Sequence, residues 1–208
     1  TGESRPCNVS RERAAASSRC EVSTLLGSPW KGRPEQKDND MPRGDADVAI
    51  IGAGPGGAWT ACLLARRGAR VLLVDPSHPR EKPCGGGVTG RALSIVVAAF
   101  AARELPAVRI SAARFTNTAA GDSALVGLDD LAEPGGALIV ASRRDFDGLL
   151  VGAARRAGAE LLVDRVTDIT RGRAGFRIDT SGGGSRMAPC VVGADGANSL
   201  TRRRLARS

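Results

Sequence analysis

Aromatic side chains are scarce in this sequence of 208 residues. Phenylalanine, tryptophan and tyrosine together make up 3% of it, and tyrosine is absent. Modules that bind single-stranded nucleic acid stack bases on aromatic side chains that lie among basic residues. The formal net charge of +8 comes mostly from scattered arginines, with one cluster at residues 202–204. No specific nucleic-acid partner is therefore expected.

Cysteine pairs and long apolar runs are missing as well. The five cysteines include no C-x-x-C pair, which argues against a disulfide framework and against a zinc site. A reducing, cytoplasmic setting fits this usage, and no metal is expected. No apolar run reaches the roughly 18 residues that cross a bilayer, and no signal-peptide core is visible. Any membrane contact is expected to be peripheral, at the surface.

The first 44 residues differ in composition from the rest. Residues 1–44 are rich in Ser, Arg, Pro, Asp and Glu and show no sustained period of 2 or 3.6 residues, so they are predicted to be a disordered extension. The segment from Met41 resembles a natural protein start. One hypothesis is that residues 1–40 are an upstream addition, and the alternative is a native flexible arm.

From residue 47 the pattern predicts a parallel sheet with crossover helices. The run VAII at 48–51 is continuously apolar, as is typical of a strand buried on both faces. A glycine-rich stretch, a helix ending at Gly68 and a second apolar strand at 71–75 follow. This βαβ opening predicts an α/β, Rossmann-like domain with helices on both faces of the sheet.

Further elements are predicted along the rest of the chain. Helices are expected at 91–102 and from residue 143 to a stop at Gly158. Strands are expected at 137–140, 160–163 and 166–170. Two hairpins are expected, one at 112–128 and one formed by 175–180 and 186–192, which would add an accessory sheet beside the parallel one.

The stretch GAGPGG is a G-x-G-x-x-G in the context that the motif requires, between a buried strand and a helix. Gly52 would make the tight turn, Gly54 would admit a pyrophosphate, and Gly57 would let helix and strand pack closely. The helix start would hold the phosphates. Asp75, at the end of the second strand, would accept ribose hydroxyls, which favours FAD or NAD over NADP at this site.

Three further stretches distinguish FAD from NAD. They are KPCGGG (82–87), RRDFD (143–147) and VGADGANS (192–199). Together with GAGPGG, and in this order, they resemble the geranylgeranyl reductase family within the flavoprotein superfamily of para-hydroxybenzoate hydroxylase. The resemblance covers roughly residues 47–204, and the Cys-Gly loop is its most specific element.

The resemblance implies a role for particular residues in binding FAD. The glycines of the loop would let its backbone approach the cofactor, with the cysteine beside the isoalloxazine in a redox role or only shaping the site. The residues expected at the FAD site, besides those of the first motif, are Cys84, Gly85, Gly86, Gly87, Arg143, Val166 (through its backbone) and Asp195. Cys84 is also the catalytic candidate. His78, the single histidine, lies in a loop between prolines and is expected to be exposed rather than catalytic.

By the same resemblance, residues 45–208 form an FAD/NAD(P)-binding domain, incomplete at its C-terminus, with the start of a substrate domain. The implied reaction is saturation of isoprenoid C=C bonds by hydride from reduced flavin, with NAD(P)H as electron donor and an isoprenoid or other apolar small molecule as substrate. A piece of this kind is expected to retain FAD weakly. The alternatives are an aromatic monooxygenase or halogenase of the same superfamily, and a non-catalytic dinucleotide-binding module.

Overall fold

The computed structural model describes residues 44–96, 104–128 and 138–206. The predicted disordered extension falls outside these ranges except for Gly44, as does the end of the predicted helix at 91–102. The helices are α1 (Pro55–Arg66), α2 (Gly90–Val96), α3 (Arg143–Arg156) and α4 (Leu200–Leu205). The strands are β1 (Val48–Ile51), β2 (Val71–Val74), β3 (Gly87–Thr89), β4 (Ala107–Ile110), β5 (Ala112–Thr116), β6 (Ser123–Gly127), β7 (Leu138–Ala141), β8 (Glu160–Leu162), β9 (Val166–Gly172), β10 (Gly175–Thr180), β11 (Ser185–Ala188) and β12 (Cys190–Gly193).

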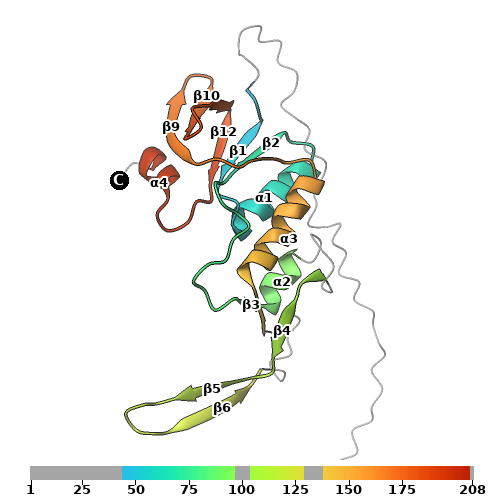
Figure 1. The fold of residues 1–208 in the computed structure, drawn as a ribbon, viewed down its shortest axis with the longest axis vertical. Coiled ribbons are helices and arrows are strands. Elements are labelled where there is room, and N and C mark those ends of the chain that lie inside the picture. Colours follow the sequence, from blue (N-terminus) through green and yellow to red (C-terminus); the bar gives the residue numbers. More distant parts are fainter. Residues whose placement is uncertain (1–43, 97–103, 129–137, 207–208) are drawn as a thin grey trace, which may run out of the picture.

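A four-stranded parallel sheet in the order β12-β1-β2-β8 lies at the centre of the fold (Figure 1). The apolar runs VAII and VLLV form β1 and β2 because both faces of these strands are covered, and every residue of β2 is buried. The βαβ opening predicted from the sequence is confirmed.

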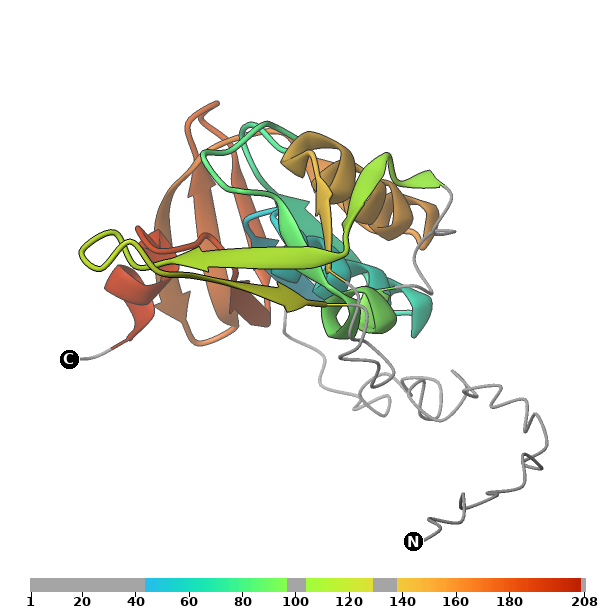
Figure 2. The ribbon, with the colours of Figure 1, turned by 90° about the horizontal axis from the view of Figure 1, so that it is seen from below.

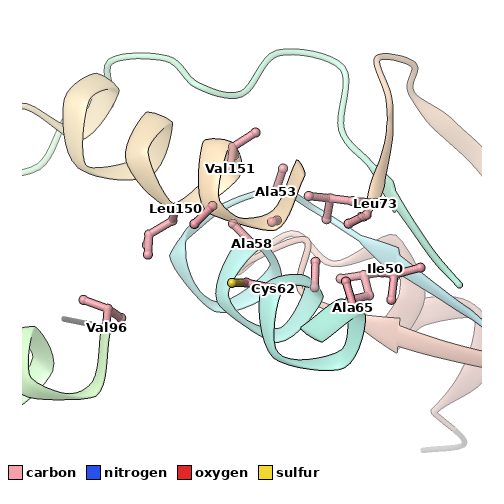
Figure 3. Close-up of a cluster of buried hydrophobic side chains, with 14 of the residues drawn as sticks. Ile50, Ala53, Ala58, Cys62, Ala65, Leu73, Val96, Leu150 and Val151 are labelled. Atoms are coloured by element: carbon pink, nitrogen blue, oxygen red, sulfur yellow. The ribbon is translucent and has the colours of Figure 1, made fainter. Parts of the chain in front are cut away.

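The two faces of this sheet are covered by different kinds of structure. On one face, Ile50 and Leu73 pack against α1 and α3, which lie side by side (Figure 3). On the other face, Ile51 and Leu72 pack with Ile178 and its neighbours in the antiparallel sheet β11-β10-β9. The expectation of helices on both faces is therefore corrected for this face, where a second sheet covers the first.

One predicted strand is split in two. The pattern of residues 186–192 predicts a single strand of a hairpin, but β11 pairs antiparallel with β10 and β12 pairs parallel with β1. Pro189 lies between them and has no N–H to give to a ladder, so the chain changes sheets there.

The remaining strands lie beside this core. The predicted hairpin at 112–128 is confirmed as β5–β6 (Figure 2), and β7 pairs with both β3 and β4 in a further antiparallel sheet. None of the helices in the described part of the chain is long and apolar enough to cross a membrane.

Candidate functional site

Two glycines, one in the turn after β1 and one in the first turn of α1, are required by the packing of the protein itself. Gly52 has φ +101°, and a Cβ there would lie 2.7 Å from the carbonyl carbon of Ala194 and 2.8 Å from Cα of Asp195. A Cβ on Gly57 would collide with the carbonyl oxygen of Gly52. The turn, the start of α1 and the end of β12 are therefore in close contact, and side chains at these two positions are excluded.

Gly54 has a different environment. A Cβ there would meet nothing closer than His78 Nε2 at 3.9 Å and Lys82 Nζ at 4.0 Å. Gly54 is also the N-cap of α1, with no side-chain capping bond and with Pro55 directly after it. The N–H groups of the first turn are thus available to an anion, which the helix dipole also favours. The open space and the uncapped helix start fit the pyrophosphate of a dinucleotide.

The Asp75 carboxylate at the end of β2 is buried and hydrogen-bonded within the protein. Oδ2 accepts from Ala53 N at 2.9 Å and lies 2.8 Å from His78 Nδ1, while Oδ1 accepts from the backbone N–H groups of Ser77 and His78, both at 2.8 Å. Burial acts to raise the pKa of Asp75, but these hydrogen bonds outweigh it and leave the pKa below its ordinary value. The predicted contact with ribose hydroxyls stays a prediction, since these hydrogen bonds all come from the protein itself.

The expectation that His78 is exposed is wrong. Its side chain is only 6% exposed and lies between Asp75 and Asp147, with Nε2 at 3.5 Å from Asp147 Oδ2. The bond from Ser77 N to Asp75 Oδ1 closes an Asx turn directly after β2. The Asp-Pro-Ser sequence was a local signal for this turn, but the partner on α3 is far away in the sequence.

The loop of residues 76–86, which we call the Cys84 loop, is attached to the start of α3. Glu81 Oε2 accepts from Ser142 Oγ at 2.8 Å, and Oε1 accepts from Arg143 N at 3.1 Å. These bonds lower the pKa of Glu81. Gly86 O accepts from Ala141 N at 3.1 Å. Sequence reasoning missed Glu81, because its partners are about 60 residues away and no local pattern indicates them.

The three glycines after Cys84 have unlike surroundings. Gly86 has φ +68°, and a Cβ there would collide with the carbonyl oxygen of Ala141 on β7. Gly85 has nothing within 4 Å of its Cβ position, and at Gly87 the nearest atom is Leu138 Cδ1 at 3.8 Å. Packing therefore explains why residue 86 is a glycine, whereas there is open space beside Gly85 and Gly87. Approach of FAD to that space stays a prediction.

Cys84 and Arg143, predicted separately, lie together. Arg143 binds the fully buried Asp147 with two bonds, from Nε to Oδ1 at 3.0 Å and from a terminal nitrogen to Oδ2 at 2.9 Å. The guanidinium also lies close to the exposed Cys84 thiol. A backbone bond from Gly86, and then the bond from Arg143, lower the pKa of Cys84. The thiolate is the reactive form of cysteine, so this arrangement favours nucleophilic or redox chemistry.

Asp195 and Val166 occupy different parts of the fold. Asp195 lies against Gly52, and its carboxylate accepts from Ser199 Oγ at 2.6 Å and Thr201 N at 3.0 Å, at the start of α4. Burial opposes these bonds, which nonetheless lower its pKa. Val166 is the first residue of β9 and packs in the core between the two sheets. The structure thus places Asp195 at the glycine turn and Val166 in the second sheet, and their FAD contacts stay predictions.

A pocket of about 500 Å³ opens beside Cys84. The loop residues 84–86 line it together with Glu81, Asp145, residues 106–108 and residues 140–142. Val108 and Val140 are exposed there, so much of the lining is apolar. Among the described residues, no group of three or more His, Cys, Asp or Glu side chains could hold a metal ion.

Comparison with known proteins agrees with this geometry. The model of the FAD binding domain family matches residues 45–208. The digeranylgeranylglycerophospholipid reductase of Methanothrix thermoacetophila is 31% identical over 76% of this chain and 41% of its own length. The menaquinone reductase of Mycolicibacterium smegmatis is 31% identical over 78% of this chain and 40% of its own length. The chain thus spans about two fifths of the length of these curated relatives.

Solved structures have the same fold. The crystal structure of PqsL, a probable FAD-dependent monooxygenase from Pseudomonas aeruginosa, superposes with a TM-score of 0.64 at 24% identity, over 77% of this chain and 45% of that one. At this identity the likeness concerns the fold alone. The family match over most of the chain, the glycine turn with its open helix start and these relatives lead to one conclusion: the chain belongs to the FAD binding domain family.

Proposed function

We propose that this chain is the FAD-binding part of an enzyme that saturates carbon–carbon double bonds of isoprenoid chains. The observation that carries the proposal is the Cys84 loop, which is hydrogen-bonded to β7 and to the start of α3 so that Cys84 lies at the pocket beside them. Two relatives named as a digeranylgeranylglycerophospholipid reductase and a menaquinone reductase support it at 31% identity each.

The residues of this chain would bind and orient the cofactor. The uncapped first turn of α1 would hold the pyrophosphate near Gly54, and the open backbone at Gly85 would face the flavin. When bound, reduced FAD supplies a hydride for the double bond. Asp147 fixes Arg143, and Arg143 keeps the Cys84 thiol at the edge of the pocket.

The substrate is proposed to be an apolar chain, and the electron donor NAD(P)H. The exposed Val108 and Val140 beside Cys84 offer apolar surface for part of such a chain. Since isoprenoid lipids reside in membranes, the whole enzyme would reach them by contact at the membrane surface.

The test is anaerobic turnover of the purified protein with FAD and either NAD(P)H or dithionite. A geranylgeranyl lipid and menaquinone are offered separately, and the products are analysed by mass spectrometry. Each saturated double bond gains one hydride and one proton, so the expected product is heavier by two hydrogens. Cys84→Ala should lower the rate, and Cys190→Ala, at another exposed cysteine, should leave it unchanged.

Two results would contradict the proposal. NAD(P)H oxidation stimulated by a phenol in air, with no reduced lipid, would indicate an aromatic monooxygenase instead. FAD that binds but accepts electrons from no donor would indicate a non-catalytic binding module.

A further inference from the structure

His78 joins two buried carboxylates that come from different parts of the fold. Nδ1 lies 2.8 Å from Asp75 Oδ2, and Nε2 lies 3.5 Å from Asp147 Oδ2. Asp147 is fully buried, Asp75 is 7% exposed, and the His78 side chain is 6% exposed. The imidazole therefore fills the space between the end of β2 and the first turns of α3.

Each carboxylate is bonded to a different part of the cofactor site. Asp75 accepts a hydrogen bond from Ala53 N in the glycine turn. Asp147 accepts two hydrogen bonds from Arg143, whose guanidinium lies close to the Cys84 thiol. A series of neighbouring groups thus runs from the G-x-G-x-x-G turn through His78 and Asp147 to Arg143, beside Cys84.

The hydrogen bonding of the imidazole is only half complete. Asp75 Oδ2 is a carboxylate acceptor, so Nδ1 carries a hydrogen and donates it. Nε2 is buried and makes no hydrogen bond within the described part of the chain. A buried polar atom without a partner costs free energy, and Asp147 Oδ2, 3.5 Å away, is itself an acceptor, so Nε2 contacts α3 by close packing without a hydrogen bond.

We propose that His78 is a positioning residue, which holds the Cys84 loop between β2 and α3 so that the glycine turn and Cys84 face one FAD molecule. Nδ1 faces Asp75 at the end of β2 and Nε2 faces Asp147 on α3, so one side chain contacts both elements. Fixing the loop before the cofactor binds removes an ordering cost that FAD binding would otherwise include. This inference depends on the FAD family and not on the proposed isoprenoid substrate.

Two substitutions at His78 each keep one of its two contacts and remove the other. In His78→Asn the amide nitrogen overlays Nδ1, so the bond to Asp75 is kept and the reach to Asp147 is lost. In His78→Gln the amide nitrogen overlays Nε2, so the contact with Asp147 is kept and the bond to Asp75 is lost. The measurements are the dissociation constant of FAD, from flavin fluorescence, and the rate of Cys84 alkylation without FAD, from peptide mass spectrometry. Cys190 is the internal control.

We expect His78→Asn to weaken FAD binding by about 10-fold, because the loop loses its contact with Asp147 and its ordering is then added to the cost of binding FAD, and to change the alkylation rate of Cys84 but not of Cys190. Should His78→Asn not fold, His78→Gln carries the test: FAD binding should weaken while the Cys84 rate stays near that of the wild type. Wild-type values in His78→Asn would overturn the proposal. An equal change at Cys84 and Cys190 would also overturn it, because it would indicate general loosening of the fold.

Discussion

At the scale of single residues, Gly85 and Gly86 provide a matched pair. Gly86→Ala places a Cβ against the carbonyl oxygen of Ala141 at φ +68°, whereas Gly85→Ala places it in open space. We expect Gly86→Ala to lower the free energy of unfolding by about 2 kcal/mol or more and Gly85→Ala to change it by less than about 0.5 kcal/mol. Urea titration of both variants measures this. Equal losses would show that the packing of Gly86 on β7 is not the cause.

The same loop should make Cys84 unusually reactive. Hydrogen bonds from the Gly86 backbone and the Arg143 guanidinium lower the pKa of its thiol. We expect alkylation of Cys84 in the folded protein to reach its half-maximal rate at a lower pH than in urea, where a thiol has a pKa of about 8.5. Arg143→Lys, which keeps the charge but loses the planar donors, should raise this pH. A folded-state profile that coincides with the one in urea would contradict the prediction.

At this scale the sequence predicted the residues that have a local context. Gly52, Gly54 and Gly57 were found because a strand before them and a helix after them define the motif. His78 and Glu81 were misjudged or missed because each finds partners on α3 or just before it, more than 60 residues away. The sequence of a loop predicts its turns, but it does not predict the distant surface against which the loop packs.

At the scale of elements, the connection between β8 and β9 depends on one carboxylate. Asp164 Oδ1 accepts from Ser181 Oγ at 2.6 Å and from Arg165 N at 2.7 Å, and Oδ2 accepts from Gly182 N at 3.1 Å. The bond from Ser181 is the largest of the effects that lower the pKa of Asp164 to about 2. Asp164 thereby joins the parallel sheet to the turn between β10 and β11.

This carboxylate should make stability sensitive to acid. The folded pKa of about 2 lies below the value of about 3.9 expected for an unfolded Asp. Its contribution is therefore complete above roughly pH 4 and is lost as the pH falls toward roughly 2. We expect Asp164→Asn to be less stable than the wild type at pH 5, with the difference shrinking by pH 2.5. Urea unfolding at several pH values measures this, and a constant difference would refute it.

Element types were predicted better than pairings. The apolar runs predicted β1 and β2, and the amphipathic pattern from residue 143 with its stop at Gly158 predicted α3. The division of 186–192 into β11 and β12 was missed although Pro189 lies within that stretch, since a proline can also be tolerated in an edge strand. An accessory antiparallel sheet was predicted, but its position over the second face of the parallel sheet was not, because an apolar strand face fits a helix or another sheet equally well.

At the scale of the whole molecule, the β5–β6 hairpin stands apart from the core (Figure 1). Phe115 is 63% exposed and Val126, on the same face, is 39% exposed. Exposed apolar strands favour association between chains. We expect Phe115→Ser with Val126→Thr to reduce light scattering on concentration while leaving Tm within about 2 °C, since neither side chain is in the core.

A control for this prediction lies in the core. Ile178→Thr replaces a fully buried side chain between the two sheets and should lower Tm and raise scattering together. If the hairpin variant also lowers Tm and raises scattering, the hairpin contributes to the stability of the core. The prediction that it folds without stabilising the core would then be wrong.

The position of β12 also affects how the chain folds while it is being synthesised. β1 lies between β2 and β12, and its pairing with Cys190–Gly193 joins segments about 140 residues apart. At a synthesis rate of about 5–20 residues per second, one side of β1 has no neighbour for roughly 7–30 s after it leaves the ribosome. During that interval its free backbone groups are open to wrong partners. Slow translation between the two strands should therefore raise the demand for chaperones, whereas delays after residue 193 should not.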